Sequence, residues 1–73
     1  MTLQDFIIDR IINLPGYPPF LKDMNWILQT DVPYSWEGFD FTDVDGNYYL
    51  QLGWNGRVMI YSMKLQTIFE SQI

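Results

Sequence analysis

The dipeptide Asn55-Gly56 constrains the fold of this 73-residue chain more than any other feature. A two-residue type I′ turn needs a positive φ angle at both central residues, and Asn-Gly adopts that conformation most readily. The stretch before the dipeptide alternates apolar residues with other side chains, which is the pattern of a half-buried strand. Its apolar positions are Tyr48, Leu50, Leu52 and Trp54. We therefore predict a β-hairpin centred on Asn55-Gly56.

If the loop consists of these two residues alone, the register of the hairpin follows by counting. Leu52 then lies opposite Met59, and Leu50 lies opposite Tyr61. Because successive strand residues point to opposite faces, the residues between them, such as Ile60, would fall on the other face. We expect the face that carries the first two pairs, the more apolar one, to pack against helices.

The N-terminal segment has the pattern of an amphipathic helix. Thr2 followed by Asp5 has the spacing of a capping box, with Asp in place of the preferred Glu. Apolar residues then recur at helical spacing, at Leu3, Ile7, Ile11 and Leu14. Pro15-Gly16 is a strong stop signal. We predict a helix over about residues 3–13.

A second helix is predicted directly after this stop. Pro18-Pro19 suits the first turn of a helix, where the amide that proline lacks would be unpaired anyway. The expected apolar stripe contains Phe20, Leu21, Met24, Ile27 and Leu28. Trp26 points away from that stripe, so it is either covered by another part of the chain or exposed to a partner. The segment from Asp31 to Pro33 should end the helical part.

The rest of the chain follows the two-residue period of strands. Phe39 and Phe41 alternate with glycine and aspartate, which predicts a strand over about residues 36–42. Residues 43–47 are rich in turn formers. Beyond the hairpin, alternating apolar residues indicate a last strand over about residues 65–70.

The fold class that combines these elements is α+β, as one domain over residues 1–73. Two N-terminal helices, within about residues 1–30, would pack on one face of a three- to four-stranded antiparallel meander over about residues 35–71. The chain has no cysteine, so disulfides and thiolate sites are excluded. Its 48% of hydrophobic residues must therefore stabilise the fold by packing.

The sequence favours a cytoplasmic protein. Its apolar stretches are short and interrupted by charged residues, so no segment has the length of a bilayer span. Asp5 and Asp9 stand among the first apolar residues, which argues against a secretory signal and against a membrane-surface helix.

The negative charge of the chain is concentrated in one segment, residues 31–46. The formal net charge is −5, which argues against direct binding to nucleic acid. The segment contains no basic residue, and its acids are Asp31, Glu37, Asp40, Asp43 and Asp45. Elsewhere four acidic residues balance four basic ones, so the segment holds the whole excess.

Aromatic residues lie among these acids, and the combination suits a surface that docks on a basic protein partner. Our leading hypothesis is a small non-catalytic interaction, regulatory or inhibitor protein without a cofactor. The chain is not expected to be an enzyme. Its partner-contact candidates are Trp26, Asp31, Tyr34, Trp36, Glu37, Asp40, Asp43 and Asp45. Compact acidic chains of this kind are common among phage and mobile-element accessory proteins, an association that carries no function by itself.

Two alternatives remain open at this point. The acidic segment could mimic nucleic acid and occupy a basic cleft of a partner. It could instead form a small metal-binding module or enzyme that uses Asp40, Asp43 and Asp45, although the spacing of a calcium loop would need acids at Phe41 and Leu52. The structural interpretation is that Asp43 and Asp45 build a β-turn. Self-association is compatible with all of these, since 13 aromatic residues are many for so small a core.

Overall fold

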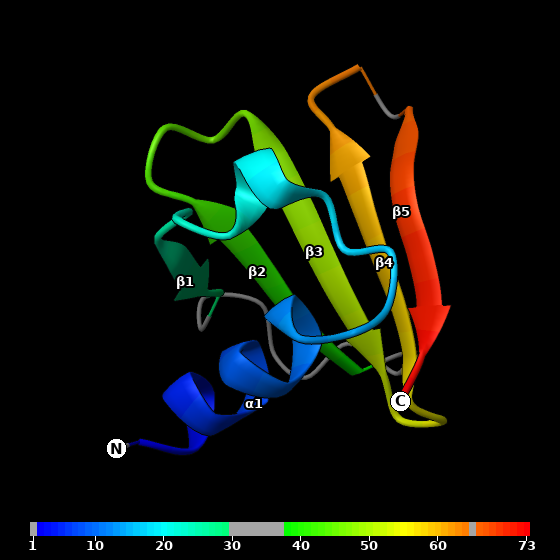
Figure 1. Ribbon diagram of the computed structural model, residues 1–73. Coiled ribbons are helices and arrows are strands. Elements are labelled where there is room, and N and C mark those ends of the chain that lie inside the picture. Colours follow the sequence, from blue (N-terminus) through cyan, green and yellow to red (C-terminus); the bar gives the residue numbers. More distant parts are fainter. Residues whose placement is uncertain (1, 30–37, 65) are drawn as a thin grey trace.

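A computed structural model describes the fold over residues 2–29, 38–64 and 66–73 (Figure 1). Its described elements, in chain order, are α1 (Leu3–Ile12), the 3₁₀-helix η1 (Pro19–Leu21), β1 (Trp26–Leu28), β2 (Gly38–Asp43), β3 (Tyr48–Gly53), β4 (Arg57–Ser62) and β5 (Thr67–Gln72). The predicted α+β class is confirmed. The details of two helices and three to four strands are wrong, because one α-helix accompanies a five-stranded sheet in the described part of the chain.

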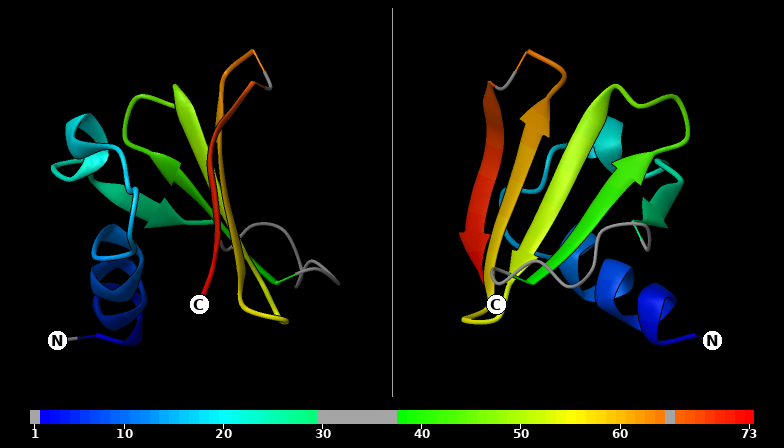
Figure 2. Two further views of the ribbon diagram at one scale, coloured as in Figure 1. Left: turned by 45° about the vertical axis from the view of Figure 1, so that its right-hand side comes forward. Right: turned by 180° about the vertical axis from the view of Figure 1, so that it is seen from behind.

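The sheet is an antiparallel meander in which each strand pairs with its neighbours along the chain. The helical segments α1 and η1 lie on one side of it (Figure 2). We call the side that they cover the inner face; it carries Phe41, Leu50, Val58, Ile60 and Phe69. The opposite side is the outer face, and alternation places the intervening strand residues there.

The predicted first helix is confirmed to within one residue at its C-terminal end. The Thr2 hydroxyl oxygen accepts the Asp5 amide at 3.1 Å, and the Asp5 carboxylate accepts the Thr2 amide at 3.3 Å. This reciprocal pair is the capping box expected from the sequence. The helix buries Ile11 completely, and Ile7 and Ile8 pack beside it against the core.

The predicted second helix is wrong. Only the single turn η1 forms after Pro18, and residues Trp26–Leu28 instead become the edge strand β1. Trp26 pairs with Asp43 of β2, and Leu28 pairs with Phe41. Strand alternation buries the Trp26 side chain and leaves Ile27 exposed. A short apolar run fits helical and strand periods equally well, and here pairing with β2 decided between them.

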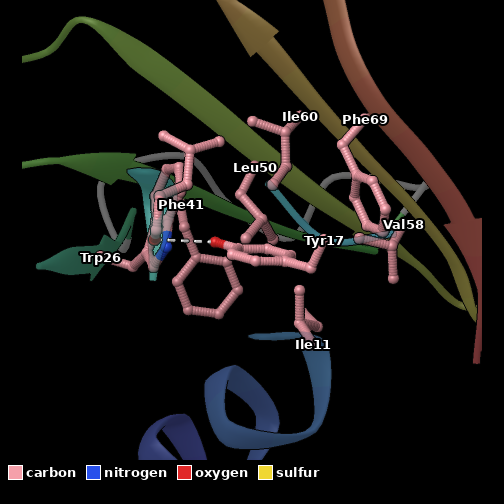
Figure 3. Packing of buried hydrophobic residues seen from close by; sticks show 9 residues of the cluster. Ile11, Tyr17, Trp26, Phe41, Leu50, Val58, Ile60 and Phe69 are labelled. Atoms are coloured by element: carbon pink, nitrogen blue, oxygen red, sulfur yellow. Dashed lines mark hydrogen bonds between the residues drawn. The ribbon is translucent and has the colours of Figure 1, made fainter. Parts of the chain in front are cut away.

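The core brings together nine buried apolar side chains, and every described helix and strand contributes at least one of them (Figure 3). They are Ile11, Tyr17, Leu21, Trp26, Phe41, Leu50, Val58, Ile60 and Phe69. The ring of Tyr17 lies edge-on to that of Phe69, with centroids 5.4 Å apart. The loop between α1 and η1 therefore fills the space between the helix and the last strand.

The hairpin forms at the predicted place, but its predicted register is wrong by one residue. Trp54, Asn55 and Gly56 all belong to the loop between β3 and β4. The Gly56 amide donates to the Gly53 carbonyl at 2.9 Å, and Gly56 has a φ of 84°. A three-residue loop of this kind is a type I turn followed by a glycine bulge.

The extra loop residue exchanges the two faces of β4 relative to the prediction. Leu52 lies opposite Val58, and Leu50 lies opposite Ile60. Val58 and Ile60 are buried on the inner face, whereas Met59 falls on the outer face together with Arg57 and Tyr61. A shift of the pairing register by one residue exchanges the two faces of a strand, and this accounts for the wrong prediction of which β4 residues are buried.

Strands β2 and β5 also differ in extent from their predicted ranges. The described part of β2 begins at Gly38, so residues 36 and 37 of its predicted range lie outside the described residues. β5 runs two residues beyond the predicted end at 70, to Gln72, and residue 65 of its predicted range is not described. It is paired with β4 through a bulge at Ile60/Tyr61.

Candidate interaction face

The outer face of the sheet carries side chains that no other described element covers (Figure 2). Strand alternation and pairing place there Ile27, Asp40, Thr42, Tyr49, Gln51, Arg57, Met59, Tyr61 and Glu70. Two tyrosines and a methionine give this face an apolar centre, and Ile27 lies at its β1 edge. The charges of Arg57 and Glu70 compensate each other in an ion pair at the β4–β5 end.

The tyrosines of β3 and β4 form the centre of this face. Tyr49 lies directly opposite Tyr61, and the Tyr49 side chain is 40% exposed. The Tyr61 hydroxyl donates to the Met59 sulfur at 3.1 Å, which ties two residues of one strand together on the surface. These rings offer both apolar area and a hydroxyl to a partner.

A shallow depression of about 330 Å³ lies beside the tyrosines. Its lining residues are Gln29, Asp40, Phe41, Thr42, Tyr49, Leu50, Gln51 and Tyr61. The Gln29 amide donates to the Thr42 hydroxyl at 2.7 Å, so the wall beside β2 is held by a hydrogen bond between side chains. Asp40 supplies the carboxylate of the depression, among otherwise neutral lining residues.

The eight predicted contact residues are distributed over different parts of the molecule. Asp31, Tyr34, Trp36 and Glu37 lie outside the described residues. Asp40 belongs to the outer face, and Asp45 is exposed in the turn between β2 and β3. Trp26 and Asp43 are buried. Among the described candidates, Asp40 alone therefore lies on the face that the tyrosines occupy.

Asp43 has a structural task in the turn that follows β2. Its carboxylate accepts the Asn47 amide at 2.6 Å and the Tyr48 amide at 2.9 Å, while its carbonyl accepts the Gly46 amide at 3.1 Å. The interpretation of Asp43 as a turn former is confirmed. Since Asp40 points to the outer face and Asp43 to the inner one, the two do not converge on one ion. The described residues contain no group of three acidic side chains placed to hold a metal.

Trp26 is a core residue with 6% of its surface exposed. Its indole N–H faces the Tyr17 hydroxyl (Figure 3), in a contact that falls short of full hydrogen-bond geometry. The Tyr17 hydroxyl itself donates to the Leu21 carbonyl at 3.0 Å. Burial raises the pKa of the Tyr17 phenol, and the weaker contact with Trp26 opposes that shift. The question that the sequence left open for Trp26 is answered: the chain itself covers it.

A second depression, of about 290 Å³, lies between α1 and β1. Asp5 and Asp9 stand at its rim, while Ile8, Met24 and Trp26 contribute apolar wall. The Gln4 side chain donates to the Trp26 carbonyl at 3.0 Å and joins the helix to the edge strand there. This hydrogen bond helps to hold α1 against the sheet beside the depression.

The sequence reasoning missed Met59 and Tyr61 as surface residues because the predicted register buried them. A signal was present in β4, where the β-branched residues Val58 and Ile60 alternate with those two. β-branched side chains suit the packed face of a sheet. Weighting that preference above the Asn-Gly turn would have placed Tyr61 outward, beside Tyr49.

Comparison with known proteins adds no family to this picture: neither a protein-family model, nor a curated protein, nor a solved structure matches the chain. Within the described residues, no helix has the length and apolar character needed to cross a membrane.

Proposed function

We propose that this chain is a non-catalytic interaction module that binds a protein partner through the outer face of its sheet. The observation that carries the proposal is the pairing of Tyr49 with Tyr61 on a face that no described element covers. Tyrosines are favoured at the centres of interfaces because they contribute large contact area with few rotatable bonds.

The partner that this face fits has a basic surface. Asp40 lies in the central depression, and Arg57, the one basic side chain among the described residues of the face, is paired with Glu70. With a net charge of −5 on the chain, the long-range field also attracts positive partners and repels acidic ones. Aromatic anchors would then supply affinity, while the charge supplies steering.

The non-catalytic part of the proposal rests on the composition of the depression. Paired carboxylates are the usual means of acid–base hydrolysis in a chain that lacks histidine and cysteine. Among the lining residues Asp40 is the single carboxyl group, and Asp43 is held by two backbone amides in the turn. This depression therefore offers an anchor site rather than an acid–base pair.

A charge-matched pair of variants tests the proposal. Asp40→Lys reverses a charge on the outer face, and Asp9→Lys makes the same reversal on an exposed position of α1. We expect affinity capture with the wild-type chain and with Asp9→Lys to retain the same protein, while Asp40→Lys and Tyr49→Ala lose it. Equal retention by all four chains would refute the outer face as the binding site.

Salt and competition separate this proposal from nucleic-acid mimicry. A mimic should be displaced from its partner by DNA or RNA and should lose binding steeply as salt is added. An aromatic interface with one central carboxylate should lose less and should resist that displacement. The mimic depends on a carboxylate array that includes Asp31 and Glu37, which lie outside the described residues.

A further inference from the structure

The two edge strands of the sheet differ in how open they are to further pairing. β1 is three residues long, whereas β5 is six residues long and contains no proline or lysine. No described residue lies along the outer edge of β5 in any of the three ribbon views (Figures 1 and 2). Proteins usually protect an edge of that length, because its unpaired backbone groups are a template for another strand.

The hydrogen bonds to β4 show which backbone groups of β5 point outward. The Ile73 amide donates to the Gly56 carbonyl at 2.8 Å, in continuation of the β4–β5 pairing. Backbone groups alternate in direction along an antiparallel strand, so Ser71 also directs its amide and carbonyl toward β4. The amides and carbonyls of Glu70 and Gln72 then point away from the sheet. A bulge interrupts the pairing with β4 at the other end of β5, so the C-terminal part of the strand is the regularly paired part.

We propose that the open edge of β5 pairs antiparallel with β5 of a second copy of this chain, with Ser71 opposite the partner's Ser71. Glu70 then lies opposite the partner's Gln72, and the outward groups of both residues form the hydrogen bonds of the new ladder. The two sheets become one ten-stranded sheet about a two-fold axis.

Side chains match in this register on both faces. On the outer face, Glu70 meets the partner's Gln72. The side-chain amide of Gln72 donates one hydrogen to the Asn55 carbonyl within its own chain and keeps a second for a carboxylate. On the inner face, Ile73 meets the partner's Phe69; in the single chain Ile73 is 46% exposed. A shift that placed Glu70 opposite the partner's Glu70 would set like charges against each other, which disfavours that pairing.

The charge distribution favours a second copy as the occupant. Two chains of net charge −5 repel each other, but Glu70 is the one charged residue among positions 66–73 and is paired with Arg57. β5 is thus an edge along which two copies can approach without adding repulsion. Each copy also carries the complementary pattern of outward groups, as isologous association requires. The outer face stays open in the dimer, so this inference is independent of the proposed binding function.

A single introduced cysteine tests both the association and its register. Residues directly opposite at a non-hydrogen-bonded position have Cα atoms about 4.5 Å apart, within the range of a disulfide. Ser71 is such a position, and the chain has no native cysteine to compete. We expect Ser71→Cys to form a disulfide-linked dimer under mild oxidation at least tenfold faster than Thr67→Cys, which lies on β5 outside the pairing. Equal rates for the two variants would overturn the proposal.

Sedimentation equilibrium of the cysteine-free chain provides the second test. Glu70→Pro removes an outward amide that β4 does not use, and it should raise the dimer dissociation constant about tenfold or more. Glu70→Ala keeps that amide and should remain within about threefold of wild type, since an exposed ion pair contributes little. The variant monomers should keep the wild-type circular dichroism spectrum. A wild-type chain that stays monomeric to about 1 mM, or equal dimerisation by Glu70→Pro and Glu70→Ala, would refute the pairing; the outer-face variants would not be affected by either result.

Discussion

The inner and outer faces of the sheet are built by alternate residues of the same strands, and yet they differ in almost every physical property. In β2, Phe41 is 1% exposed and Asp43 is buried in the turn network, whereas Asp40 and Thr42, which alternate with them, face outward. The inner face is closed by α1 and the loop that follows it. The outer face keeps its tyrosines partly in water. Burial on the inner face supplies the stability of the fold, and the outer face is the one that we propose binds a partner.

The largest contrast between the faces is expected for aromatic truncation. Phe41→Ala should lower the free energy of unfolding by about 3–5 kcal/mol, because it leaves a cavity among fully buried neighbours. In a domain of this size that corresponds to a fall in melting temperature of more than about 10 °C. Tyr49→Ala on the outer face should cost less than about 1.5 kcal/mol. Thermal denaturation followed by circular dichroism measures both, and equal losses would contradict the division into a core face and a contact face.

The two aspartates of β2 provide a smaller contrast. Asp43→Ala leaves the amides of Asn47 and Tyr48 without their acceptor, and it should cost about 1.5–3 kcal/mol. Asp40→Ala removes an outward carboxylate and should change stability by less than about 0.5 kcal/mol. Urea denaturation at pH 7 gives the comparison. A stability loss from Asp40→Ala as large as that from Asp43→Ala would show that Asp40 has a structural role.

The smallest effect is expected from removal of single tyrosine hydroxyls. Tyr17→Phe keeps the ring contact with Phe69 but loses the donor to the Leu21 carbonyl, at a cost of about 1 kcal/mol near pH 7. Tyr49→Phe, on the outer face, is the matched control and should change stability by less than about 0.5 kcal/mol.

The same variant has a signature at alkaline pH. Burial raises the pKa of Tyr17 above its ordinary value of 10.0, so above about pH 10 the unfolded chain releases this proton before the folded chain does. The stability that Tyr17 contributes is therefore complete below pH 10 and is lost as the pH rises through the folded-state value. The difference in unfolding free energy between wild type and Tyr17→Phe should narrow as the pH rises above 10 and through the folded-state pKa. A constant difference over that range would mean that the phenol is not buried.

Sequence reasoning located most of the elements and few of the surfaces. The capping pair Thr2 and Asp5 and the alternation in β3 are local patterns, and the elements that they predicted formed. The candidate site fared differently, since Asp40 is the one described candidate that shares a face with the tyrosines. Trp26 and Asp43 are buried because β1 and β2 pair with each other, and that pairing joins residues more than ten positions apart.

The sequence by itself determined where this chain starts its helix, where it turns between β3 and β4, and that the stretches of β2 to β5 are extended. Those features depend on hydrogen bonds and backbone angles within a few residues, so local side chains specify them. The tertiary structure decided that residues 26–28 form a strand, and that the hairpin loop holds three residues rather than two. Both outcomes depend on burial of apolar side chains through long-range contacts: Trp26 enters the core in the first case, and Val58 and Ile60 do so in the second. Asn55-Gly56 accommodates either loop length, and packing of β4 against the inner face selected the one that leaves Tyr61 outside.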